Sequence, residues 1–385
     1  MNSKRLILFI LILVSIAGAI IFVRQQPDLS NKESRVQIGV LFPLTGDASS
    51  YGQKGKKAIE LAVDDCNARE GSAGKKVTAI FEDSKGNPKD GVSAAQKLIS
   101  VDKVPAIIGD ALSSVTLPVA AVAEPNKVVL ISPDSSAPAL THAGKYIYRI
   151  WPSDLVEGEA AAEFAVSRGF SKAAIFHLNN DYGNAIAEIF TKHFSNDGRK
   201  VVFNSSYQDT TTDWRAIVTP LASADADVVY VAGYYKDTAA ILRTATELGI
   251  KAQFIGATAI EDENFIKLAG KASEGIVYPL ASGFDAASTE NTDSKIFVEA
   301  FKKRFGYDPG WMEAYSYDSF MLVCKAIASS NEGVTGTQIR DYLDGMGSYH
   351  GVTGDIKFDE NGDVIRGVTI KTVKDGHFVP YPNKP

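Results

Sequence analysis

The stretch IIGDALSSVTLPVA (residues 107–120) passes from an apolar strand, through a few small polar residues, into an apolar segment of helical character. A second stretch, VLISPDSSAPALT (129–141), repeats the arrangement, with paired serines again placed after an apolar strand. Apolar strands that alternate with helices are typical of a parallel sheet with helices on both faces. The two stretches therefore predict neighbouring strands of such a sheet, each followed by serines.

The same alternation continues through most of the chain and falls into two series. The first extends from VQIGVLFPL (36–44) to VVLIS (128–132), and the second begins after RIWPSD (149–154) and continues to AQFIGAT (252–258). Past residue 280 the pattern changes to helices followed by paired strands. We therefore predict an α/β protein with two Rossmann-like lobes.

Length and charge agree with this organisation and exclude one class of partner. A chain of 385 residues is too long for one minimal core and suits two lobes of ordinary size. Its formal charge is −6, and it contains no basic block and no patch of mixed aromatic and basic residues. Because nucleic-acid binding depends on such patches, we expect no nucleic acid among its partners.

The N-terminus has the composition of an export or membrane segment. Lys4 and Arg5 precede an unbroken apolar run from Leu6 to Val23. A basic region before an apolar run is typical of a secretory signal, but this run is long enough to approach a membrane span. We therefore expect residues 1–35 to form a signal peptide or an N-terminal membrane anchor with a linker. In either case the rest of the chain is exported, to the periplasm or the outer face of the cell membrane.

Two cysteines, Cys66 and Cys324, remain in the exported part. They could form one disulfide, although spacing alone says nothing about their proximity. Cys66 lies on an apolar stripe with helical spacing, which favours the interpretation that both are buried thiols.

The motifs of common catalytic and metal sites are missing. The sequence contains no GxxxxGK[ST], GxGxxG, HExxH or GxSxG motif and no cysteine pair with zinc spacing. Its histidines are scattered: His142, His177, His193, His350 and His377. The sequence thus offers no support for an enzyme, a metal site or a cofactor.

The paired serines have the chemistry of a binding site for a small anion. Ligands of open α/β sheets bind beyond the carboxyl ends of the strands, where both serine pairs fall. Serine hydroxyls and the N–H groups at a helix N-terminus can bind a carboxylate without a metal. Ser113 and Ser114 precede one such helix, and Ser135 and Ser136 follow the neighbouring strand. The alternative is ordinary helix capping, because serine is a preferred N-cap residue.

These stretches, together with several others, resemble the periplasmic solute-binding proteins of branched-chain amino-acid ABC transporters, the type I leucine/isoleucine/valine-binding group. The resemblance covers about residues 36–375, in the order of the family. The matching stretches include IGVLFPLTGDASSYGQKGKKAIELAVDDCNAREG, FEDSKGNPKDGVSAAQKLI, YRIWPSDLVEGEAAA, DYGNAIAE and VYVAGYYKDTAAILRTATELGI.

The resemblance implies a hinged clamp whose chain crosses three times between two lobes. Lobe one is expected to contain residues 36–152 and 280–351, and lobe two residues 153–279 and 352–385. Closure of the lobes buries the ligand and excludes water, which strengthens its polar contacts.

The resemblance also assigns candidate ligand contacts. Ser113 stands at the position of a carboxylate-binding serine, with Ser114 beside it. The backbone carbonyl of Ser135 is expected to face the ligand's ammonium group, and Ser136 to supply a hydroxyl. The other matching positions are the aromatic residues Tyr51, Tyr182 and Tyr234 and the acidic residue Asp154.

One position departs from the family pattern. Amino-acid-binding members carry an acidic residue, which pairs with the ammonium group, where this chain has Thr258. Glu261, Asp262 and Glu263 follow a few residues later and could take that role, or could merely charge the first turn of a helix. The ligand is therefore left open between an amino acid, an amide and a carboxylate without an amine.

The resemblance implies a monomeric solute-binding subunit that captures a small molecule and delivers it to an ABC transporter permease in the membrane. It implies no enzymatic activity and no cofactor. A ligand-sensing receptor module of the same fold is the alternative, and an enzyme on this scaffold is a third hypothesis.

Overall fold

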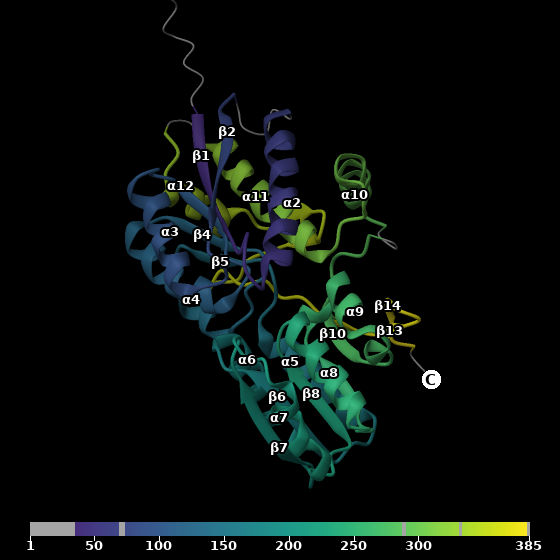
Figure 1. The fold of residues 1–385 in the computed structure, drawn as a ribbon. Coiled ribbons are helices and arrows are strands. Elements are labelled where there is room, and N and C mark those ends of the chain that lie inside the picture. Colours follow the sequence, from purple (N-terminus) through teal and green to yellow (C-terminus); the bar gives the residue numbers. More distant parts are fainter. Residues whose placement is uncertain (1–34, 69–73, 287–289, 331–332, 383–385) are drawn as a thin grey trace, which may run out of the picture.

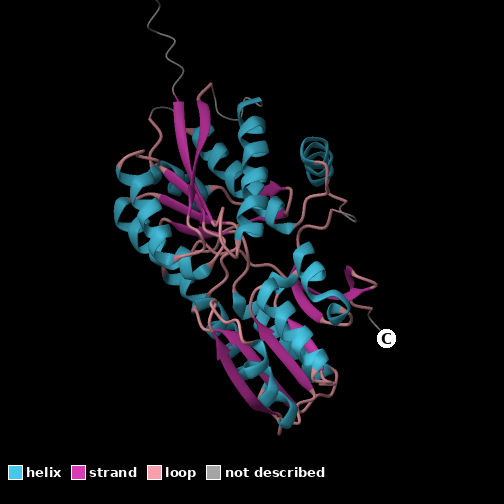
Figure 2. Cartoon of the chain, viewed as in Figure 1, coloured by secondary structure: helices cyan, strands magenta, loops and turns pink. Residues whose placement is uncertain are grey.

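The computed structural model describes residues 35–68, 74–286, 290–330 and 333–382. The chain forms two lobes, one above the other in Figure 1, and connecting segments of the chain run between them. Each lobe contains one sheet with helices packed around it, as the secondary-structure colours of Figure 2 show. The predicted α/β architecture with two lobes is confirmed.

The first lobe is built on a sheet of five parallel strands in the order β2-β1-β3-β4-β5. All residues of its two shortest central strands, β3 and β4, are buried, because helices cover both faces. The strands are β1 Arg35–Phe42, β2 Lys76–Asp83, β3 Ala106–Gly109, β4 Val129–Ser132 and β5 Ile147–Arg149.

The helices of this lobe come from both ends of the chain. Helix α11 belongs to the C-terminal part of the sequence, yet it packs along α2 and is buried on nearly all sides. The helices are α2 Ser49–Ala68, α3 Pro88–Ser100, α4 Ser113–Ala123, α10 Thr292–Phe305, α11 Trp311–Ser329 and α12 Gly336–Gly345, with short 3-10 turns η3 Glu124–Asn126 and η4 Pro138–His142.

A disulfide bond joins helices α2 and α11. Cys66 on α2 is bonded to Cys324 on α11, with their Cα atoms 6.1 Å apart. The expectation of two buried free thiols is therefore wrong, although both residues are buried as predicted. The partners lie 258 positions apart in sequence, so the helical stripe around Cys66 carried no information about its partner.

The second lobe has a seven-stranded sheet in the order β14-β13-β10-β9-β8-β6-β7. Strands β6 to β10 pair in parallel, and the C-terminal strands β13 and β14 add an antiparallel edge. The strands are β6 Lys172–Leu178, β7 Lys200–Tyr207, β8 Val228–Ala232, β9 Gln253–Gly256, β10 Val277–Ala281, β13 Val368–Lys374 and β14 His377–Pro380.

Five α-helices and three short 3-10 turns accompany this sheet. They are α5 Asp154–Ser167, α6 Asp181–Phe194, α7 Trp214–Val218, α8 Tyr235–Glu247 and α9 Glu263–Ala269, with η5 Thr219–Ser223, η6 Thr258–Ile260 and η7 Gly270–Ser273.

The chain passes between the lobes in three places: after β5, after β10 and before β13. A hairpin of β11 Tyr349–Gly351 and β12 Gly354–Ile356 precedes the last passage. The segment that follows this hairpin still lies on the first lobe, because the N–H of Arg149 donates to the carbonyl of Gly362 at 3.0 Å. This differs from the expected boundary, which placed residue 362 in lobe two.

The apolar run of residues 6–23 lies outside the described residues. Among the helices that the structure describes, none is long and apolar enough to cross a bilayer.

Candidate ligand-binding site

A small cavity lies where the strand ends of the two lobes face each other. Its volume is about 30 Å³. The residues that line it are Tyr51, Ala111, Leu112, Ser113, Asp134, Ser136, Trp151, Glu157, Tyr182, Tyr234, Thr258, Ala259 and Trp311. We call it the interlobe cavity.

Loops that follow parallel strands supply most of this lining. Ser113 and Asp134 follow β3 and β4 in the first lobe, and Tyr234 and Thr258 follow β8 and β9 in the second. This placement obeys the general rule that open α/β sheets bind ligands beyond the carboxyl ends of their strands. Trp311 reaches the cavity from the first turn of α11.

The structure brings six of the nine candidate residues to this cavity: Tyr51, Ser113, Ser136, Tyr182, Tyr234 and Thr258. The other three lie elsewhere. Ser114 lines a separate hollow, and Asp154 is fully buried but is not among the lining residues. Ser135 is also buried, with its hydroxyl 2.6 Å from that of Thr116. Contact of any of the nine with a ligand stays a prediction.

The hydroxyl of Ser113 connects the two serine loops. Its Oγ accepts hydrogen bonds from the N–H groups of Ser136 and Ala137, each at 3.1 Å. A serine hydroxyl has one proton to donate in addition to its two acceptor sites, so Ser113 can still donate into the cavity. The alternative interpretation as a helix cap does not describe it, because the N-cap of α4 is Leu112 and no side chain caps that helix.

Aromatic rings form the walls. Tyr182 and Tyr234 stack with their ring centroids 5.5 Å apart and their planes at 4°. Tyr51 approaches Tyr234 edge-on at 6.2 Å, and Trp151 lies 4.9 Å from Trp311. Such rings bury a large area with little loss of side-chain entropy. The two tryptophans were not identified from the sequence, and Trp311 carried no signal because its helix lies far from the strand ends in sequence.

Two carboxylates line the same cavity, and neither was singled out from the sequence. Glu157, on the first turn of α5, accepts the N–H of Thr258 through Oε1 at 2.6 Å. The hydroxyl of Thr258 donates to the carbonyl of Pro279, so this residue is fixed as the support of Glu157. Asp134 is the second carboxylate. None of the lining residues is Lys, Arg or His.

The electrostatics of these acids reflect burial without a nearby cation. Burial raises the pKa of Glu157, and the charge of Asp154 raises it further. Burial also raises the pKa of Asp134 well above its ordinary value, and the charges of Glu157, Asp154 and Asp110 add to that. Both acids therefore favour their protonated forms while the cavity is empty, and a cationic group that enters would favour their ionised forms.

The three acids after Thr258 do not line the cavity. Glu261 accepts hydrogen bonds from the Tyr278 hydroxyl at 2.6 Å and from Lys371 at 2.7 Å. Asp262 caps α9, and Glu263 is exposed on that helix and pairs with Lys267. The position that could replace an acid at residue 258 is therefore Glu157, which comes one helical turn after Asp154 in the sequence.

Polar contacts hold the lobes together beside the cavity. Asp262 of the second lobe accepts hydrogen bonds from Ser50 at 2.6 Å and Lys54 at 2.7 Å of the first. Burial opposes ionisation of Asp262, but the charge of Lys54 and these hydrogen bonds hold its pKa below the ordinary value. The Tyr51 hydroxyl donates to the carbonyl of Ala259 at 2.6 Å. The lobes are thus closed over the cavity.

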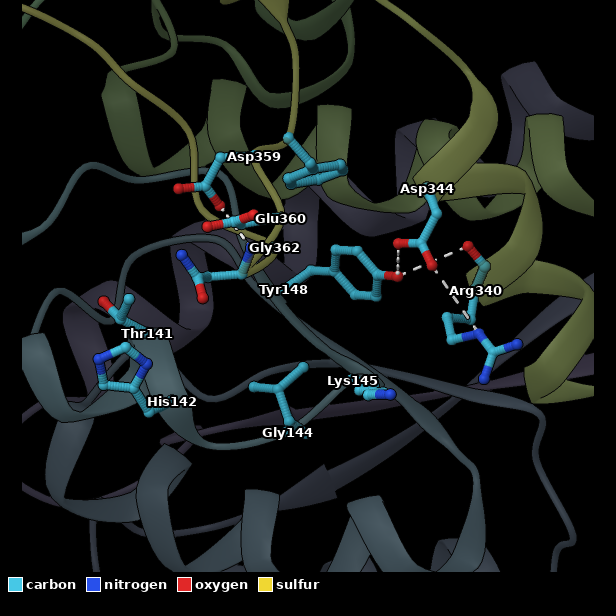
Figure 3. Close-up of a pocket in the computed structure, with 13 residues that line it drawn as sticks. Thr141, His142, Gly144, Lys145, Tyr148, Arg340, Asp344, Asp359, Glu360 and Gly362 are labelled. Carbon is cyan, nitrogen blue, oxygen red and sulfur yellow. Dashed lines mark hydrogen bonds and ion pairs between the residues drawn. The ribbon is translucent and has the colours of Figure 1, made fainter.

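A much larger cleft, of about 810 Å³, lies on the first lobe (Figure 3). Some of its polar groups are paired with one another, and others, such as His142, Lys145 and Glu360, are exposed to solvent. The hydroxyl of Tyr148 donates to Asp344 at 2.6 Å, and Asp359 accepts the N–H groups of Asn361 and Asp363 within its own turn. None of the nine candidate residues lines this cleft.

The whole described architecture matches one family. The family model named periplasmic binding protein matches residues 35–377. The chain belongs to this family. The suspected relationship to type I solute-binding proteins is therefore confirmed.

Curated relatives of this periplasmic binding protein match most of its length. A leucine-, isoleucine-, valine-, threonine- and alanine-binding protein of Pseudomonas aeruginosa is 27% identical over 86% of this chain and 87% of its own. The Leu/Ile/Val-binding protein BraC3 of Rhizobium johnstonii is 31% identical over 69% of this chain and 71% of its own.

Solved structures agree. A leucine-binding protein of Thermotoga maritima superimposes with a TM-score of 0.84 at 28% identity, covering 90% of this chain and 98% of its own. A branched-chain amino acid transporter substrate-binding protein of Streptococcus pneumoniae, in complex with isoleucine, gives 0.83 at 26% identity with the same coverage.

The family consists of solute-binding proteins of ABC transporters and not of enzymes. This periplasmic binding protein is accordingly an exported solute-binding protein that works with an ABC transporter permease. The prediction of a binding protein without catalytic activity is confirmed.

Proposed function

We propose that this periplasmic binding protein captures a zwitterionic α-amino acid in the interlobe cavity and delivers it to the permease. The observation that carries the proposal is that Ser113, with a proton free to donate, and Glu157, a buried carboxylate, line the same cavity. A hydroxyl donor suits the ligand's carboxylate, and a carboxylate suits its ammonium group.

Glu157 takes the role that Thr258 leaves open. A buried ammonium without a carboxylate partner is costly, and Glu157 removes that cost from the first turn of α5. The backbone N–H of Thr258 fixes one Glu157 oxygen at 2.6 Å, so position 258 still contributes through its main chain. An amino acid is thereby favoured over an amide or an amine-free carboxylate.

An amine-free carboxylate is less compatible with this cavity. Such a ligand would bring a negative charge that nothing in the cavity balances, because none of the lining residues has a cationic side chain. A solute-binding protein of Rhodopseudomonas palustris, 25% identical, has been solved with 3,4-dihydroxybenzoic acid, so amine-free acids belong in the test.

The finer assignments complete the proposal. Residues 1–35 act as a signal peptide or as an anchor that holds the protein at the outer face of the membrane. The protein is a monomer that closes on its ligand, and Tyr182 and Tyr234 cover the bound amino acid. The alternative is a ligand-sensing module of the same fold.

Titration calorimetry tests the ligand class. The full-length chain, purified in mild detergent, is titrated with a panel of L-amino acids and with the same carbon skeletons lacking either the amine or the carboxylate. We expect saturable binding only when both groups are present. Equal affinity for a skeleton without the amine would contradict the proposal. Dependence of amino-acid uptake on the protein and its permease separates transport from sensing.

A further inference from the structure

Asp134 is a second carboxylate in the interlobe cavity, supplied by the first lobe. It lies in the loop between β4 and η4, immediately before the serine pair. The charged groups that influence it are all acids: Glu157 and Asp154 on α5, and Asp110 after β3. Among the described residues, no side chain or backbone group contributes a hydrogen bond that would stabilise its ionised form.

Arg149, the cation that acts on neighbouring Asp154, already has partners of its own. Arg149 is buried, and its guanidinium donates to both oxygens of Asp363 and to the carbonyls of Ser136 and Ala137. The bonds to Ser136 and Ala137 hold the serine loop against β5, and those to Asp363 hold the turn that contains it. Arg149 therefore does not serve as a counter-ion for Asp134, and none of the residues lining the cavity can.

One α-ammonium group carries a single positive charge, so it can balance the charge of only one of the two carboxylates. If Glu157 binds the ammonium group, we expect Asp134 to face the side chain of the bound amino acid. A hydrocarbon side chain would bury Asp134 without a partner, which is unfavourable, whereas a nitrogen donor would satisfy it.

The aromatic wall is compatible with such a donor. The faces of the stacked Tyr182 and Tyr234 rings and of the nearby tryptophans carry negative potential, which attracts a cationic nitrogen and also packs against an alkyl stem. The cavity thus combines apolar contact area with one unpartnered acid.

We propose that Asp134 selects an amino acid whose side chain carries a nitrogen donor, cationic or amide, over one with a purely hydrocarbon side chain. This inference rests on the proposed function, because it takes the α-amino and carboxyl groups as already bound. It predicts a preference that differs from the leucine-type ligands named for the relatives.

Matched ligands test the preference by calorimetry on the full-length chain. L-lysine and L-norleucine share a carbon skeleton and differ only in the terminal ammonium, and L-glutamine offers a neutral amide. We expect at least one donor-bearing ligand to bind about tenfold or more tightly than norleucine, as for a hydrogen bond to a charged group. Tighter binding of lysine would show that the site prefers a cationic side chain. Tighter binding of glutamine would show that it prefers an amide.

Two variants assign the preference to Asp134. Asp134→Ala should weaken the donor-bearing ligand and strengthen norleucine, so the ratio of the two affinities collapses. Asp134→Leu keeps a similar side-chain size and removes both the charge and the acceptor oxygens, which keeps the test decisive if the alanine variant fails to fold. Asp209→Asn, which changes an exposed aspartate of the second lobe, is the control and should leave the ratio unchanged.

The outcomes separate the inference from the proposed function. If norleucine binds as tightly as lysine and glutamine, or if Asp134→Leu leaves the ratio unchanged, the inference is wrong while amino-acid capture stands. If no amino acid binds at all, the proposed function fails and the inference fails with it.

Discussion

Two hollows of this protein, the cleft on the first lobe and the interlobe cavity, differ in more than their volume. The cleft on the first lobe has about 810 Å³, and the interlobe cavity about 30 Å³. In the large cleft, Tyr148 is bonded to Asp344, and Asp359 is bonded within its own turn. In the small cavity, the Ser113 proton and the Asp134 carboxylate have no protein partner among the described residues that uses them.

The comparison favours the interlobe cavity as the proposed binding site, because buried groups with unused hydrogen-bonding capacity lie there and not in the larger cleft. Buried polar groups are normally satisfied by the protein itself, so groups that are not satisfied there are available to a ligand. The interlobe cavity is small because the lobes are closed over it, as the Asp262 contacts with Ser50 and Lys54 indicate.

The largest expected effect comes from Glu157. Glu157→Gln keeps the shape of the side chain and removes the charge that we expect to face the ligand's ammonium. Loss of one partner of a buried charge pair costs about 2–5 kcal/mol, which is roughly 30- to several-thousand-fold in affinity. Calorimetry with the preferred amino acid measures it.

The control for this variant lies on the same helix. Glu159→Gln changes an exposed glutamate of α5 and should leave the affinity unchanged. Unchanged affinity in Glu157→Gln would contradict the distinction between the interlobe cavity and the cleft. The cavity acid would then contribute no more to ligand binding than the acids of the cleft do.

The fold was predictable from the sequence because it depends on local periodicity. Buried strands such as β3 and β4 are short apolar runs, and each is followed by polar residues where the sheet ends. The rule that ligands bind at those ends was enough to bring Ser113, Ser136 and Tyr234 to one cavity.

The site residues that the sequence did not predict depend on burial and on contacts between segments that lie far apart in the chain. Neither is a local property of the sequence. Glu157 resembles an ordinary acidic residue of a first helical turn, where a negative charge is favourable anyway. Only the tertiary structure shows that it is buried against Thr258. Trp311 and the Cys66–Cys324 bond likewise depend on α11 returning to α2 from far along the chain.

The second largest loss of ligand affinity is expected from Ser113. Its neighbour Ser114 allows a comparison of two serines in one loop. Ser113→Ala removes a donor to the ligand's carboxylate, and a hydrogen bond to a charged group is worth about 1.5–3 kcal/mol, or roughly 10- to 150-fold in affinity. Ser114→Ala, one residue later, changes a serine outside the cavity and should leave affinity intact. Equal losses in the two variants would contradict the assignment.

The pH dependence of affinity is a third test. Glu157 has a raised pKa, and it must be ionised to pair with an ammonium. The bound state therefore holds fewer protons than the free state, so affinity should fall as the pH decreases through this raised pKa, by up to about tenfold per unit for one proton.

The groups that face Glu157 affect this titration. Asp154 raises its pKa, and the N–H of Thr258 lowers it. Calorimetry in buffers of different ionisation enthalpy should show proton release on binding in the wild type and less release in Glu157→Gln. Absence of any proton release would contradict this account of the cavity.

A smaller effect is expected from the contact that closes the lobes. Lys54→Met removes one partner of buried Asp262, and Lys54 itself is 24% exposed, so we expect a loss of about 1 kcal/mol in the closed state. Affinity should fall a few-fold, and X-ray scattering should show less compaction on ligand addition. Lys57→Met, on the same helix but facing Tyr307 of its own lobe, is the control.

The smallest effect completes the comparison in the large cleft. Tyr148→Phe removes the hydrogen bond to Asp344 and should cost about 1 kcal/mol of stability. Ligand affinity should stay unchanged, as measured by calorimetry beside a thermal melt. A large loss of affinity would indicate that the cleft, and not the interlobe cavity, binds the solute.

The pair of tryptophans in the cavity wall has an optical consequence. The chain contains three tryptophans, and Trp151 and Trp311 both line the interlobe cavity. The third, Trp214, packs beside Tyr207 in the second lobe. Two of the three tryptophans therefore lie at the proposed ligand site. The emission spectrum of the unlabelled chain should report occupancy directly, with Trp214→Phe as the variant that leaves only the reporting pair.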